Sequence, residues 1–133
     1  MIEVLILKDV VDGILAYSQD LHPKESILLL RGELDMRKGR IKIEELVMPP
    51  RSIQGKGFSA FPLAPLPLDL SIVGVMHSHP SGTPLPSVTD LNSFFGGLMI
   101  ICVHPYDGLR CINVYDGSGR KIPFSVYEGG EKK

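Results

Sequence analysis

The sequence predicts an α/β (α+β) domain in which a mixed, mostly antiparallel β-sheet is packed by helices. Two observations lead to this fold class. Predicted strands outnumber predicted helices, and their order is helix, three or four strands, helix, three strands. The length of 133 residues and the hydrophobic fraction of 44% are enough for one core, so we expect a single domain over residues 1–133.

The first half contributes one predicted helix and two predicted strands. Apolar residues recur at helical spacing over residues 8–21, and the His-Pro pair at 22 and 23 stops them. Residues 26–30 (SILLL) are typical of a buried strand. A charged turn over 32–40 then leads to a strand over 41–48 with period-two alternation. The residues expected to share one face of that strand are Ile41, Ile43, Glu45 and Val47.

The second half begins with an irregular, proline-rich segment over 52–70, in which we expect a short strand at 57–61. An apolar strand, SIVGVMH, follows over 71–77. A serine at a capping position and apolar spacing predict a helix over 87–95. Three further strands are expected at roughly 98–103, 110–115 and 121–127.

Composition excludes some functions. The formal net charge of −1 offers no long-range attraction to a polyanion, so nucleic-acid binding is not expected. The opening MIEVLILKDVVDG has too short an apolar run for a signal peptide or a membrane span, which predicts a soluble cytoplasmic protein. Oligomeric state is open, although the apolar proline-rich segment could bury itself in a homodimer.

Two cysteines, Cys102 and Cys111, flank a turn-rich stretch between two predicted strands. A hairpin there would place them roughly opposite each other. They are interpreted as buried thiols, since disulfides are rare in the cytosol outside hyperthermophiles, but the pairing stays open.

The chemistry is concentrated in HSHPSGTPLPSVTD, which runs from His77 to Asp90. On an extended backbone, residues two apart point to the same side, so His77 and His79 can aim both imidazoles at one point. The Gly/Pro loop turns the chain back, and Asp90 falls in the first turn of the next predicted helix. Three such ligands leave the fourth position of Zn²⁺ for water, whose pKa the metal lowers to about 7.

Each part of this pattern has a plain alternative. A lone HxH pair is more often incidental than a ligand pair, and Ser87-x-x-Asp90 is an ordinary capping box in outline. The combination of HxHP after an apolar strand, a Gly/Pro loop and SxxD at a helix start favours the metal site.

HxHP, six residues, then SxxD resembles the signature of the JAMM (MPN+) zinc metalloproteases, most closely the archaeal single-domain type. The resemblance extends from HPKESILLL to ICVHPYDGLRCINVYD and implies a JAB1/MPN-like (cytidine-deaminase-like) fold. It implies that His77, His79 and Asp90 bind one zinc ion, that Glu25 is general base and then general acid, and that Ser87 steadies the oxyanion. The family cuts bonds after the carboxyl end of ubiquitin or a ubiquitin-like protein.

Several residues are weaker candidates. Exposed glutamates, a turn aspartate and two proline-adjacent histidines fall in this group: Glu33, Glu44, Glu45, Asp69, His22 and His104. The proline-rich segment 55–70 either offers a sheet edge to an extended Gly-Gly tail or covers the core. A non-catalytic MPN-type scaffold is the alternative function. The deaminase signature H-x-E with P-C-x-x-C is absent from the sequence.

Overall fold

The computed structural model describes residues 2–49, 71–86 and 97–129. The strand predicted at 57–61 and the helix predicted over 87–95, with Ser87 and Asp90, lie outside these residues. The described elements are β1 (Glu3–Leu7), α1 (Lys8–Leu21), β2 (Ile27–Asp35), β3 (Arg40–Val47), β4 (Ile72–His79), β5 (Leu98–Val103), the short 3-10 helix η2 (Leu109–Cys111), β6 (Ile112–Asp116), β7 (Lys121–Ile122) and β8 (Ser125–Tyr127).

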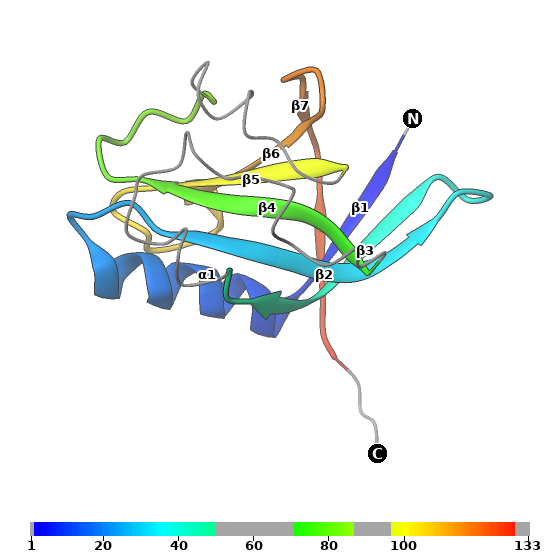
Figure 1. The fold of residues 1–133 in the computed structure, drawn as a ribbon, viewed down its shortest axis with the longest axis horizontal. Coiled ribbons are helices and arrows are strands. Elements are labelled where there is room, and N and C mark those ends of the chain that lie inside the picture. Colours follow the sequence, from blue (N-terminus) through cyan, green and yellow to red (C-terminus); the bar gives the residue numbers. More distant parts are fainter. Residues whose placement is uncertain (1, 50–70, 87–96, 130–133) are drawn as a thin grey trace.

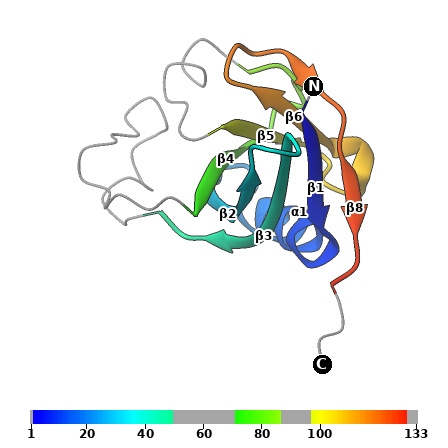
Figure 2. The same cartoon turned by 90° about the vertical axis from the view of Figure 1, so that its right-hand side faces the viewer.

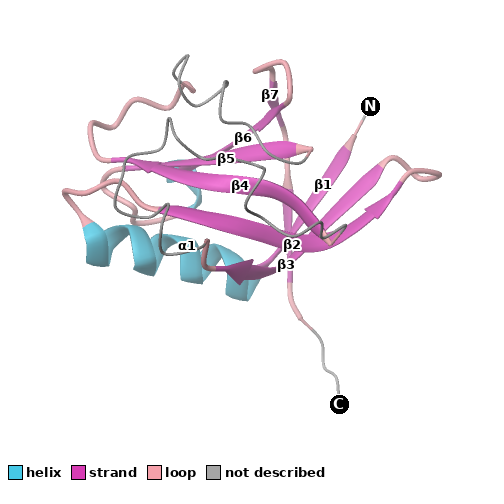
Figure 3. Cartoon of the chain, viewed as in Figure 1, coloured by secondary structure: helices cyan, strands magenta, loops and turns pink. Residues whose placement is uncertain are grey.

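The described strands form one mixed sheet in the order β7-β6-β5-β4-β2-β3-β1-β8. Most neighbouring pairs are antiparallel, whereas β1 runs parallel to β3 and β8, and β4 runs parallel to β5. The sheet curls, and α1 lies against its concave face (Figures 1 and 2). The predicted fold class is therefore confirmed, with strands far outweighing helix in the described residues (Figure 3).

Helix α1 has the predicted bounds, 8–21, because its apolar residues fall on one face. Val10, Val11 and Ile14 are buried against the sheet, whereas Lys8 pairs with Asp12 in solvent at 3.1 Å. The amide of His22 still donates to the carbonyl of Ser18, and Pro23 then prevents a further turn. Within the described residues, no helix is both long and apolar enough to cross a membrane.

Three strand predictions need correction. The predicted order began with a helix, but β1 precedes α1. The charged segment 32–40 is only partly a turn, since β2 continues to Asp35. The strand expected over 121–127 is two short strands, β7 and β8, separated by Pro123 and Phe124, because proline cannot donate to a ladder hydrogen bond.

The alternation expected in β3 is also wrong in its second half. Ile41 and Ile43 are buried as predicted, but Glu45 is exposed. The register between β2 and β3 shifts at Arg31 and Gly32, so that one residue of β3, Glu44, has no direct partner. Such a bulge moves the following side chains to the other face.

The central strands hold the core. Every residue of β5 is buried, and β4 is buried from Val73 to His79. These apolar runs are typical of parallel neighbours covered on both faces. Gly74 lets the two strands pair, since a side chain there would overlap the carbonyl oxygen of Leu98.

We expect Gly74→Ala to lower the free energy of unfolding by about 1–3 kcal/mol, because the added methyl group forces the paired backbones apart. Urea denaturation measures this change. Gly108→Ala is the matched control, since a Cβ at Gly108 meets no atom within 4 Å and its φ of 171° is extended backbone. Equal stability of the Gly74 variant and the wild type would contradict the packing argument.

Both cysteines are free and buried, as the preferred interpretation held. Cys102 lies opposite Ile112 in the β5–β6 ladder, one residue away from Cys111. Burial raises the pKa of the Cys102 thiol to about 12, so this thiol is neutral at physiological pH.

Native protein at pH 8 should therefore leave Cys102 unmodified by a thiol reagent, because the reactive thiolate is absent and the sulfur is covered. Denaturant should expose two reactive thiols. Peptide mapping of the modified sites after brief exposure checks this, and rapid native labelling of Cys102 would contradict it.

Candidate metal centre

The pairing of β2 with β4 fixes where the predicted site residues meet. Ile27 is the register partner of His77. One residue further, the amide of Ser78 donates to the carbonyl of Ser26 at 3.0 Å, so the pairing continues to the strand end. Glu25 precedes β2, and continuing the register by one more residue would set it opposite His79. Directly opposed residues in an antiparallel pair share a face, so we expect Glu25 on the same side of the sheet as both histidines.

That side faces away from α1. Cys102 lies near the buried Ser18 of the helix, so it points toward α1. Ser78 is the register partner of Cys102 and shares its face. His77 and His79 flank Ser78 and therefore point to the opposite face. Their spacing in the sequence correctly predicted a common side for the two imidazoles.

His79 is held in one orientation by the loop that follows it. Its Nδ1 lies 2.8 Å from the carbonyl oxygen of Thr83, and a carbonyl can only accept, so Nδ1 carries the proton. Nε2 then carries the lone pair. Metal-binding histidines are typically fixed in this way, with one nitrogen donating to a carbonyl and the other coordinating. The Thr83 contact thus fixes the tautomer and the ring orientation of His79.

The loop itself is tied down at several points. The amide of Gly82 donates to the carbonyl of His79 at 3.0 Å, and Gly82 adopts a φ of 86°, which suits glycine. The buried Tyr115 of β6 donates its hydroxyl to the carbonyl of Pro84. These bonds fix the backbone that supplies the Thr83 acceptor.

Two buried serines lie beneath the histidines on the α1 side. The hydroxyl of Ser78 accepts from the Ser26 amide at 2.7 Å and from the Ser26 hydroxyl at 2.9 Å. The two strand ends are thereby joined by side-chain as well as backbone bonds, next to Glu25 and between the histidines.

Ser78→Ala should lower the free energy of unfolding by about 1–3 kcal/mol, because the buried Ser26 amide loses its acceptor. Chemical denaturation tests this. Ser125→Ala, at an exposed position in β8, should change stability by less than about 0.5 kcal/mol. Indistinguishable stabilities of the two variants would argue against the serine pair.

The structure describes three of the five predicted site residues, and these differ in their exposure to solvent. His77 is fully buried and His79 is 8% exposed, while Glu25 is exposed just before β2. Ser87 and Asp90 lie outside the described residues. Within the described ranges, no three His, Cys, Asp or Glu side chains come together as a metal site.

The weaker candidates that the structure describes lie in two places. Glu45 pairs with Arg31 at 3.3 Å on the exposed part of β3. Glu33 and Glu44 are exposed on the same hairpin. Asp69 lies outside the described residues. His22 and His104 stack on each other with ring centroids 4.5 Å apart.

Sequence reasoning missed the residues that support the ligands. The Thr83 contact uses a backbone carbonyl, so no side-chain pattern could have predicted it. Ser26 and Ser78 were available from the sequence, because each adjoins a site residue and period two places it on the opposite face.

Comparison with known proteins gives the family. The profile described as prokaryotic homologs of the JAB domain matches residues 7–115. A probable metalloprotease of Haloferax volcanii is 30% identical over 127 residues, covering 92% of this chain and 79% of that protein. The chain belongs to the JAB domain family.

Comparison with solved structures supports the same family. A JAB1/MPN domain protein from Archaeoglobus fulgidus is 30% identical, with a TM-score of 0.66 and coverage of 91% of this chain and 96% of the other. A structure reported as a JAMM metalloprotease-like zinc site in the proteasome and signalosome is 28% identical, with a TM-score of 0.69 and coverage of 95% and 99%. The chain is thus of the zinc metallopeptidase kind in family and fold.

Proposed function

We propose that this protein is a zinc-dependent isopeptidase or peptidase that hydrolyses the bond after the C-terminal Gly-Gly of a ubiquitin-like protein. His77, His79 and Asp90 hold one zinc ion in this proposal. Glu25 acts as general base and then general acid, and Ser87 steadies the oxyanion. The proposal includes a cytoplasmic location.

The orientation of His79 is the observation that carries the proposal. A histidine whose Nδ1 donates to a carbonyl presents Nε2 as a ligand, and His77 points to the same side. Two imidazoles with one carboxylate match the donor set of catalytic zinc sites, which keep one position open. Zinc held there would supply an ionisable water and polarise the scissile carbonyl.

The register of β2 supports the role of Glu25. A general base has to lie within hydrogen-bond reach of the proton it takes, directly or through one water. The register pairs Ile27 with His77, and continuing it by two residues would set Glu25 opposite His79, with opposed Cβ atoms about 4.5–5.5 Å apart. Its carboxylate can therefore accept a proton beside the histidines and return it to the leaving amine.

Cleavage should require both zinc and the Glu25 carboxylate. The substrates are a candidate Gly-Gly-ending modifier as a linear fusion and as an isopeptide conjugate, each with zinc and with chelator. We expect Glu25→Gln to lower kcat/KM at least about a hundredfold, because the amide cannot accept the proton. Zinc stoichiometry, measured by mass spectrometry, should stay the same in this variant.

Glu44→Gln is the matched control, because Glu44 is an exposed glutamate on β3 away from the histidines. It should cleave like the wild type. His79→Ala should lose zinc as well as activity. Full activity in chelator, or in Glu25→Gln, would overturn the catalytic proposal.

A non-catalytic MPN-type scaffold is the second candidate, since related folds include members without activity. It would be favoured by zinc bound at full occupancy without cleavage of either substrate. The His79 tautomer supports a ligand role in either case.

A further inference from the structure

A cluster of three aromatic rings lies at the end of the sheet where β4 finishes, and the proposed mechanism does not use it. His22 and His104 stack, and the ring of Tyr106 stands edge-on to both, with centroids 5.6 and 5.5 Å away. The histidines are exposed, whereas Tyr106 is 1% exposed. The tyrosine is thus the buried centre of the cluster.

Tyr106 joins two segments. Its hydroxyl lies 3.2 Å from Nδ1 of His22, which is three residues before Glu25. Its amide donates to the carbonyl of Val103 at 3.0 Å, and Val103 is the register partner of His79. Burial raises the pKa of the Tyr106 hydroxyl.

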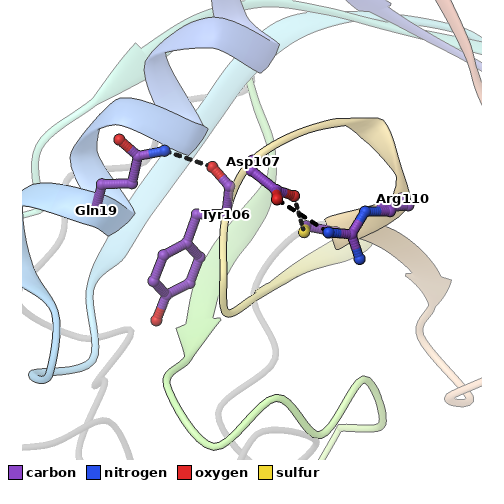
Figure 4. Close-up of polar contacts among 5 residues, drawn as sticks. Gln19, Tyr106, Asp107 and Arg110 are labelled. Carbon is purple, nitrogen blue, oxygen red and sulfur yellow. Dashed lines mark hydrogen bonds and ion pairs between the residues drawn. The ribbon is translucent and has the colours of Figure 1, made fainter.

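The backbone of Tyr106 has an unusual conformation that a hydrogen bond from α1 holds in place. Its φ is 58°, a region that residues with a Cβ adopt rarely. Its carbonyl accepts a hydrogen bond from the Gln19 side chain of α1 at 2.6 Å (Figure 4). Next to it, Asp107 accepts from Arg110 at 2.9 Å and so stiffens the loop. Such conformations persist where surrounding contacts enforce them, often near functional sites.

We propose that Tyr106 is a positioning residue for Glu25, because its hydroxyl joins the segment 22–25 to the end of β5, which pairs with the histidine-bearing strand β4. The distance between those two segments sets how far the carboxylate of Glu25 lies from the histidines. The inference rests on the proposed function. A tyrosine that served only to fill the core would need its ring, not its hydroxyl.

Tyr106→Phe separates these roles, because it keeps the ring against both histidines and removes the hydroxyl. We expect kcat on the linear Gly-Gly fusion to fall about 10- to 100-fold, as small misplacements of catalytic groups cause, with KM unchanged. Tyr127→Phe is the matched control, since Tyr127 contacts Lys42 on the other side of the sheet order, in β8. Wild-type kcat in Tyr106→Phe would overturn the proposal.

A double mutant shows whether the effect passes through Glu25. In the Glu25→Gln background, removing the Tyr106 hydroxyl should lower the remaining rate no further, because there is no carboxylate left to position. A full additional 10- to 100-fold loss would mean that Tyr106 acts on something other than Glu25, and would overturn the proposal.

Hydrogen exchange gives a readout that does not depend on activity. The amides of Lys24 and Ser26 donate to Leu21 and to Ser78 at 2.7 Å each, so they report on the segment that holds Glu25. Their exchange should be faster in Tyr106→Phe, while the Gly97 amide, bonded to Val73, is unchanged. If the wild type cleaves no substrate, the proposed function fails, and unchanged exchange at Lys24 and Ser26 would separately overturn the anchoring by Tyr106.

Discussion

The register between β2 and β4 is the constraint on which the rest of the site depends. Hydrogen bonds at the ends of these strands, reinforced by the paired hydroxyls of Ser26 and Ser78, leave no freedom to slide one strand along the other. A slip of one residue would turn every side chain to the opposite face. Glu25 would then face α1 instead of the histidines.

Along β2 and β4, alternating side chains place different residues on the two faces of the sheet. His77 and His79 occupy the face away from α1, and the hydroxyls of Ser26 and Ser78 occupy the other. The hydroxyl of Tyr106 lies beside His22 and its carbonyl accepts from Gln19, so the segment before Glu25 is also connected to the helix. Rigid second-layer contacts of this kind are what hold a reactive geometry to within fractions of an ångström.

Sequence periodicity was sufficient wherever one pattern extended over a whole element. It placed α1 at 8–21 and β5 at 98–103, and it put His77 and His79 on one side of their strand. It failed at β1, because EVLIL runs into the helix without a Gly or Pro to separate them. It failed in the second half of β3, because a bulge leaves no trace in the pattern of apolar residues.

For the candidate site, too, the sequence predicted some features and not others. Strand alternation predicted that the two histidines share one side of β4, which the structure bears out, whereas Glu25 came from the family resemblance. The contacts that orient them could not be predicted, because they use backbone carbonyls, as at Thr83, or residues 80 or more positions apart, as between His22 and Tyr106. Asp90, Ser87 and the single-domain organisation remain predictions.

The short strands at the two edges of the sheet affect how copies of the chain could associate. At the two ends of the described sheet, β7 has two residues and β8 has three. Such short borders offer few open amides and carbonyls for another β-strand to join, so they resist end-to-end growth of sheets into aggregates. A purified sample should accordingly stay dispersed at the high concentrations that structural and exchange measurements need.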